Sequence, residues 1–188
     1  MISDTDLLAQ CDRLFIGLEA PTAPRIQAGG HPCQGVYTTP TGRRPKTAFI
    51  ATHYNVDFSE HYIAPYLAAH GYGFLGWNTR YRGHPAIVNR TPGIGRANML
   101  KSWLSMWSLE TSQCKGAAQL PRLDTPALVV QGLADVGVFP SDARTIFDAI
   151  GAKDKTLELV KGAHYFEDSR AEREEVAALV AQWVAARC

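Results

Sequence analysis

Short apolar runs and polar loops alternate in the second quarter of the chain. They predict three elements, a buried strand at 46–52, a helix at 60–70 and a second strand at 72–77. Ile63 and Leu67 lie one turn apart on the apolar face of that helix. Strand, helix and strand joined by short links predict a βαβ unit, in which the two strands are parallel and the crossover is right-handed.

The second half of the chain shows the same alternation. An apolar strand is predicted at 127–131, a helix at 141–150 and another strand at 156–160. The chain closes on an amphipathic helix at 172–186. Five apolar side chains are expected to face inward from this helix: Val176, Leu179, Val180, Trp183 and Val184.

Residues 1–30 have a weaker pattern, and a short strand follows them. Residues 34–39 read as a short strand, and the turn at 40–42 closes it. Five apolar side chains ahead of that strand have helical spacing: Leu7, Leu8, Cys11, Leu14 and Phe15. Taken together, the elements predict an α/β fold with a mostly parallel sheet flanked by helices.

Composition is that of one globular domain spanning 1–188. A chain of 188 residues with 46% hydrophobic and 20% charged residues can bury a single core. The sequence has no internal repeat and no shift in composition that would mark a domain boundary. We therefore expect a single domain.

Charge and cysteine content bear on the binding partners and the cellular location of the protein. Its 19 Lys and Arg against 18 Asp and Glu give a net charge of +1, so no basic surface points to nucleic acid or to a membrane. The acidic N-terminus lacks the cationic and apolar regions of a signal peptide. The four cysteines are far apart, which favours free thiols in a reducing compartment. A cytoplasmic location is expected.

Two candidate catalytic residues follow the strands of the second half. Asp135 comes three residues after Gly132, and His164 lies in the loop after the next strand. Loops that follow neighbouring parallel strands meet at the carboxyl edge of the sheet. We expect a carboxylate oxygen of Asp135 within hydrogen-bond reach of a ring nitrogen of His164, which would fix the tautomer of the imidazole and leave its other nitrogen as a general base.

The order strand, G-x-x-D, helix, strand and histidine resembles the C-terminal part of the α/β-hydrolase superfamily. Residues 47–83 are similar to that fold's third strand, oxyanion loop, first helix and fourth strand. The resemblance implies an oxyanion loop at His53, Tyr54 and Asn55, with Tyr54 where the superfamily often has glycine. It implies that Asp135 and His164 are two members of a catalytic triad.

The third member of such a triad is not recognisable. The superfamily carries its nucleophile on a G-x-S-x-G turn between a strand and a helix, and no such motif occurs in this chain. The interval from Gly83 to Asp135 holds one loop and one Trp-rich helix at 94–109. The sequence therefore predicts a sheet that lacks the central strand of the nucleophile elbow, with an internal deletion near 84–85.

Further candidate site residues are few. Trp103 and Trp107 lie on one face of the predicted helix at 94–109, where they form either plain core or a lid over a hydrophobic substrate. The histidines have no metal-ligand spacing such as H-E-x-x-H, so neither a metal nor another cofactor is expected.

Three functions stay open on the sequence. The first is ester hydrolysis by a chain derived from a serine hydrolase, with His164 as base, Asp135 as the orienting group and the loop at 53–55 donating to the oxyanion. The second is an enzyme that uses the His–Asp pair without a nucleophile, as cofactor-free oxygenases and lyases of the resembled superfamily do. The third is a non-catalytic binding or scaffold protein. A small ester-like substrate is expected as partner, and so is a homo-oligomer, because loss of a central strand exposes sheet edges.

Overall fold

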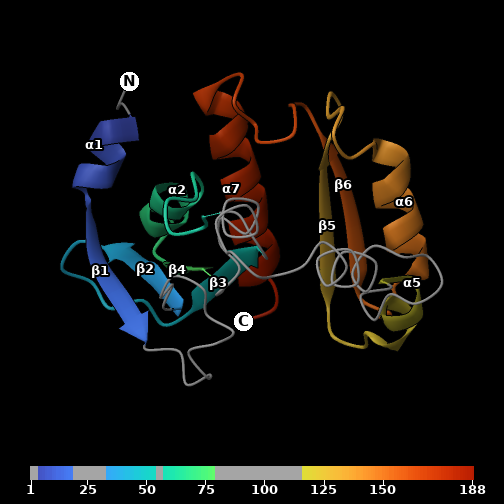
Figure 1. Ribbon diagram of the computed structural model, residues 1–188, viewed down its shortest axis with the longest axis horizontal. Coiled ribbons are helices and arrows are strands. Elements are labelled where there is room, and N and C mark those ends of the chain that lie inside the picture. Colours follow the sequence, from blue (N-terminus) through green and yellow to red (C-terminus); the bar gives the residue numbers. More distant parts are fainter. Residues whose placement is uncertain (1–3, 19–32, 54–56, 79–115) are drawn as a thin grey trace, which may run out of the picture. The chain divides into compact units, whose positions relative to one another are not determined.

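The computed structural model in Figure 1 describes most of the chain in two compact units. The first unit combines residues of the N-terminal half with 177–184, and the second comprises the rest of the C-terminal half. The described residues are 4–18, 33–53, 57–78 and 116–188. The predicted Trp-rich helix, the interval of the predicted deletion and the missing elbow strand fall within 79–115, outside the described residues.

A four-stranded sheet forms the centre of the first unit, in the order β1-β2-β4-β3. Its strands are β1 (Cys11–Leu18), β2 (Cys33–Pro40), β3 (Ala48–His53) and β4 (Gly73–Asn78). β2 is antiparallel to both β1 and β4, whereas β3 and β4 are parallel. The parallel pair and the helix α2 (Ala64–Ala69) between its strands confirm the predicted βαβ unit.

Helix α2 is shorter than the predicted helix at 60–70. The residues before it form successive turns, in which the N–H of His61 donates to Phe58 O at 3.2 Å and the N–H of Ala64 to His61 O at 3.1 Å. The His61 ring accepts the Ile63 N–H at 3.3 Å, which takes a backbone donor out of the helical pattern. Gly71, with φ of +88°, follows the last turn of the helix in the left-handed conformation that commonly ends helices.

The helical spacing at 7–15 is only half realised. Helix α1 spans Asp4–Ala9, and the chain then turns into β1. β1 pairs along its whole length with β2. Backbone hydrogen bonds to β2 therefore determined the strand conformation of residues whose local pattern favoured a helix. Leu14 and Phe15 are 62% and 63% exposed, so they do not form the buried helical face that the spacing predicted.

Strand β3 is less buried than its apolar run predicted. Its residues alternate between exposed and half-buried, and Ile50 is 74% exposed. Among the described residues β3 has a strand neighbour on one side only, which makes it an edge of the described sheet. An apolar run alone does not distinguish a central strand from an edge strand.

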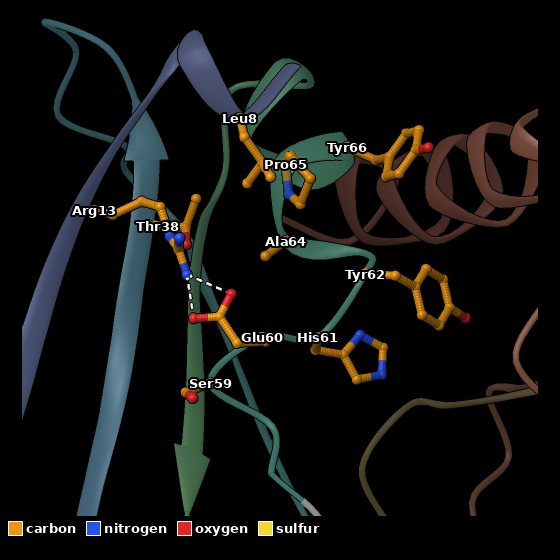
Figure 2. A pocket seen from close by; sticks show the side chains of 10 residues that line it. All are labelled: Leu8, Arg13, Thr38, Ser59, Glu60, His61, Tyr62, Ala64, Pro65 and Tyr66. Atoms are coloured by element: carbon orange, nitrogen blue, oxygen red, sulfur yellow. Dashed lines mark hydrogen bonds and ion pairs between the residues drawn. The ribbon is translucent and has the colours of Figure 1, made fainter. Parts of the chain in front are cut away.

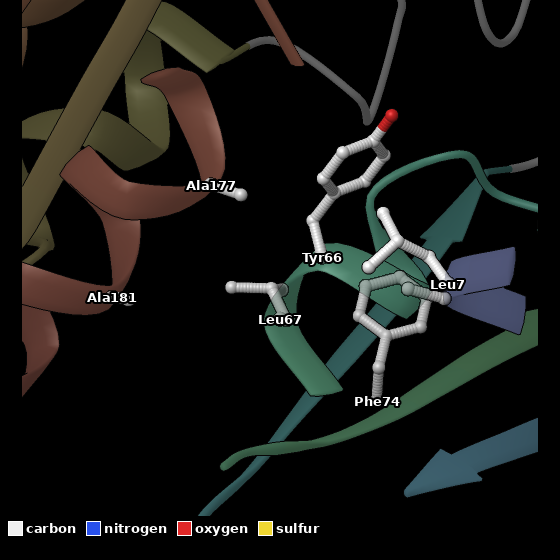
Figure 3. Close-up of a cluster of buried hydrophobic side chains, with 7 residues drawn as sticks. Leu7, Tyr66, Leu67, Phe74, Ala177 and Ala181 are labelled. Carbon is white, nitrogen blue, oxygen red and sulfur yellow. The ribbon is translucent and has the colours of Figure 1, made fainter. Parts of the chain in front are cut away.

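The core of the first unit lies between the sheet and its helices (Figure 3). Leu67 of α2 is 1% exposed and Phe74 of β4 is 3% exposed. The last helix, α7 (Arg170–Ala185), adds Ala177 and Ala181, one turn apart, and Ala177 is fully buried. Of the five side chains predicted to face inward from this helix, Val176 is buried and the other four are half-buried.

The second unit is built on two parallel strands, β5 (Ala127–Gly132) and β6 (Lys155–Val160). They are joined by helix α6 (Pro140–Ala149), and a short helix α5 (Gly116–Gln119) with a 3-10 turn (Leu120–Arg122) precedes them. All three predicted elements, at 127–131, 141–150 and 156–160, are confirmed to within one or two residues. This β5–α6–β6 arrangement sets the loops after both strands at one edge.

Candidate active site

Asp135 and His164 meet at the carboxyl ends of β5 and β6. The two strands pair in register up to Gly132 and Val160, and each candidate residue follows its strand within four positions. Oδ2 of Asp135 lies 2.8 Å from Nδ1 of His164. The geometry predicted for this pair is therefore confirmed, and its cause is the parallel register of β5 and β6.

The Asp135 carboxylate is buried and fully engaged, with its side chain 5% exposed. Oδ1 accepts the backbone N–H groups of Gly137 at 2.7 Å and Val138 at 2.9 Å. Oδ2 accepts a hydrogen bond from Nε2 of Gln131 at 3.0 Å, in addition to its contact with Nδ1 of His164. Burial by itself raises the pKa of Asp135, but these hydrogen bonds outweigh it and hold the pKa well below its usual range. The group is an ionised acceptor at neutral pH.

The His164 imidazole is oriented by this carboxylate. Because an ionised carboxylate can only accept, Nδ1 of the neutral ring carries the proton. Nε2 is left as a lone-pair nitrogen, and no described residue is its hydrogen-bond partner. The side chain is 39% exposed, and the Tyr165 ring packs edge-on against it at 4.5 Å between centroids. Such an imidazole can take a proton from a group that approaches Nε2.

The loop that carries His164 has an unusual backbone. Gly162 adopts φ of +136°, and a Cβ there would lie 2.5 Å from the Phe166 ring. The carbonyl of Gly162 accepts the N–H of Ala134 at 2.9 Å, which ties the loop after β6 to the loop after β5. Phe166 itself has φ of +52°, and its carbonyl accepts Nε of Arg173 at 3.1 Å. Strain of this kind persists where surrounding contacts impose it, often at functional sites.

Gly162→Ala is expected to destabilise the protein by about 2–3 kcal/mol, because alanine meets both an unfavourable φ and the Phe166 ring. Gly42→Ala is the matched control. Gly42 has φ of +67° with open space around its Cβ position, so only the conformational cost of about 1 kcal/mol applies. Urea unfolding of both variants measures the difference. Equal losses would show that Phe166 does not restrict this loop.

The low pKa of Asp135 also predicts a pH dependence of stability. Because the pKa is lower in the folded chain than the unfolded value of about 4, ionisation stabilises the fold above that pH, and this contribution is lost as the pH falls below it. The free energy of unfolding is measured in urea from about pH 7 down to about pH 3, which spans the ordinary carboxyl pKa of about 4. We expect the wild-type value to approach that of Asp135→Asn as the pH falls. Asp148→Asn, at an exposed aspartate of α6, is the control. Parallel curves for wild type and Asp135→Asn would contradict the assignment.

The predicted oxyanion loop is described only at its first residue. His53 ends β3 opposite Asn78 of β4, and its ring stacks on Phe58 at 5.8 Å between centroids. Tyr54 and Asn55 lie outside the described residues, so their oxyanion role stays a prediction. Trp103 and Trp107, proposed for the substrate pocket, also lie outside them.

A pocket of about 100 Å³ lies in the first unit, beside α2 (Figure 2). Arg13 lines it, and the guanidinium donates to both carboxylate oxygens of Glu60, at 2.7 and 2.8 Å. His61 also lines the pocket, and burial lowers its pKa, which favours the neutral ring. The Arg13 cation and the Glu60 carboxylate form an exposed ion pair with each other.

Within the described ranges, no three His, Cys, Asp or Glu side chains are grouped so that they could hold a metal ion. None of the helices in the same ranges is long and apolar enough to span a membrane.

Sequence reasoning missed two buried polar side chains at strand ends. Gln131 is the penultimate residue of β5, 7% exposed, and contacts Asp135. Asn78 ends β4 with 1% exposure, accepts the Phe58 N–H at 2.7 Å and donates to Asp57 at 2.7 Å. In the sequence, each is an amide residue at the end of an otherwise apolar strand. Such a residue indicates a buried hydrogen-bonded contact, because a buried amide needs partners.

These features define an α/β-hydrolase fold, and solved structures support that assignment. The chain is similar to a cold-adapted esterase from an Arctic intertidal metagenomic library, with 13% identity and a TM-score of 0.58 over 92% of this chain and 94% of that one. A dienelactone hydrolase from Anabaena variabilis has 16% identity and a TM-score of 0.56 over 93% and 97%. A Pyrococcus furiosus esterase has 11% identity and a TM-score of 0.52 over 97% and 95%. Neither a family model nor a curated protein matches the sequence.

Proposed function

We propose that this chain hydrolyses carboxylic esters of small molecules, with His164 as the general base and Asp135 as the group that orients it. The observation that carries the proposal is the 2.8 Å contact between His164 Nδ1 and a buried carboxylate that already accepts three other hydrogen bonds. A chance contact between a surface histidine and a carboxylate would not require the carboxylate to be buried and to accept three further hydrogen bonds. This arrangement keeps one tautomer, in which the lone pair of Nε2 has no partner among the described residues.

The reaction follows from that proton acceptor. Nε2 removes the proton of an attacking hydroxyl, either of water or of a side chain, as the oxygen adds to the ester carbonyl. The tetrahedral intermediate then expels the alkoxide, which takes the proton back from the imidazolium. With water as the attacking group the products are the acid and the alcohol. With a side chain the acyl group is transferred to the protein first, and water releases it in a second cycle.

Two observations favour an ester as substrate. The similar structures include proteins described as esterases and a dienelactone hydrolase, and a lactone is a cyclic ester. Large apolar side chains are exposed in the two loops of the dyad, where Val136 is 84% exposed and Phe139 and Tyr165 are each 55% exposed. Apolar surface next to a polar reacting group suits an ester with a hydrocarbon substituent.

A series of p-nitrophenyl esters of graded chain length tests the proposal. We expect saturable release of nitrophenol by the purified chain, with higher kcat/KM for the chain lengths that cover the exposed apolar loops. Release no faster than in buffer for every ester would contradict the proposed function.

A fluorophosphonate probe decides between the two attacking groups. Because the sequence holds no G-x-S-x-G turn, we expect no stoichiometric labelling of a serine, and water is then the attacking group. Labelling of one serine in most molecules would overturn this expectation. Peptide mapping would then identify the nucleophile, with Ser102, Ser105, Ser108 and Ser112 as the first positions to inspect.

A further inference from the structure

Gln131 of β5 contacts the carboxylate of the dyad at the oxygen that the loop amides do not use. Its Nε2 lies 3.0 Å from Asp135 Oδ2, 3.0 Å from the Val138 carbonyl and 3.1 Å from the carbonyl of Gly132. Three acceptor oxygens surround this one nitrogen. The reverse orientation of the amide would set Oε1 against all three, so the surroundings select the orientation in which Nε2 donates.

The contacts close a ring of hydrogen bonds around the carboxylate. The Val138 N–H donates to Asp135 Oδ1 at 2.9 Å, and the carbonyl of the same residue accepts from Gln131. Gln131 in turn donates to Asp135 Oδ2, the oxygen that His164 uses. The loop amides hold one carboxylate oxygen, and the amide of Gln131 holds the other. Each oxygen is thereby fixed by a donor besides the imidazole.

We propose that Gln131 is a positioning residue of the dyad, whose amide holds Asp135 Oδ2 in line with His164 Nδ1 and shares the negative charge of the carboxylate. A carboxylate so stabilised keeps its own charge and leaves the shared proton on the imidazole, which is the state that a general base needs. The role of Gln131 in turnover rests on the proposed ester hydrolysis, whereas its hydrogen bond to Asp135 does not.

Other charged groups of the surrounding elements have partners of their own. Asp142 accepts the Phe139 N–H at 3.0 Å, and Glu167 accepts the Tyr165 N–H at 2.8 Å. Lys161 faces Glu172 at 3.9 Å. Among the described residues, Gln131 is the one side chain besides His164 for which a hydrogen bond to Asp135 is found. A response of Gln131 to protonation of the dyad is therefore expected to travel through Oδ2.

The first test uses the wild-type protein and nuclear magnetic resonance of its side-chain amides. We expect the Gln131 amide protons to shift together with the ring protons of His164 as the pH is varied, and to lose this response in His164→Gln. In Asp135→Ala the response of the Gln131 amide is expected to vanish, because the bridging oxygen is gone. A Gln131 signal that ignores His164 in the wild type, or still follows it in Asp135→Ala, overturns the proposal.

The second test is kinetic and uses Gln131→Met, which keeps the length of the side chain and removes its donor. We expect kcat on p-nitrophenyl esters to fall about 10-fold with KM within a factor of two, the pattern of a lost orienting contact. Gln119→Met, at an exposed glutamine of α5, is the matched control and is expected to leave kcat unchanged. An unchanged kcat in folded Gln131→Met overturns the proposal. Should Gln131→Met fail to fold, the wild-type resonance test still decides.

The two tests separate this proposal from the proposed function. Coupled amide signals in a protein that hydrolyses no ester would uphold the role of Gln131 at the dyad and contradict ester hydrolysis. Ester hydrolysis with uncoupled amide signals would support the proposed function and contradict the role of Gln131.

Discussion

His164→Ala is expected to lower kcat/KM for p-nitrophenyl esters by roughly 10²–10⁴-fold, to the background of the uncatalysed reaction. The reason is that Nε2 of this residue is the proton acceptor of the proposed mechanism, and no second described histidine contacts Asp135. The side chain is 39% exposed, so its removal leaves little cavity and the folded structure is expected to survive. Initial rates at neutral pH measure the loss.

His70→Ala is the matched control for this prediction. His70 is exposed at the end of α2 and lies outside the dyad, so the same change of side chain there is expected to leave the rate unaltered. If His164→Ala kept most of the wild-type activity with an unchanged melting temperature, the dyad would not be the site of hydrolysis.

Asp135→Asn is expected to lower kcat by about 10³–10⁴-fold while the protein stays folded. The Gly137 and Val138 N–H groups both require an oxygen at the Oδ1 position, which leaves the new amide nitrogen facing His164 Nδ1. That nitrogen donates where the carboxylate accepted. The imidazole then takes the opposite tautomer, with the proton on Nε2, and Nε2 can no longer act as a base.

The tautomer itself can be measured. In the nitrogen resonances of His164 we expect a protonated Nδ1 in the wild type and a protonated Nε2 in Asp135→Asn. Asp148→Asn, on the exposed side of α6, is expected to change neither the resonances nor kcat. Full activity in Asp135→Asn, or a tautomer unchanged from the wild type, would remove Asp135 from the mechanism.

The sequence determined the local elements and the order of the site. The spacing of apolar residues located β4, β5, β6, α6 and α7 to within a few residues, because each of these elements is set by side chains that are neighbours in the sequence. The G-x-x-D loop and the later histidine were sufficient to pair Asp135 with His164, since parallel strands bring such loops to one edge.

The tertiary structure decided what depends on partners distant in the chain. Residues 11–18 became a strand because β2 offered a full ladder, although their local spacing favoured a helix. The partial burial of β3 depended on its position at an edge of the described sheet, and a run of apolar residues does not indicate that position. Gln131 could be read as a polar strand residue, but its role depends on the loop folding back to bring Asp135 and Val138 within reach of one amide nitrogen.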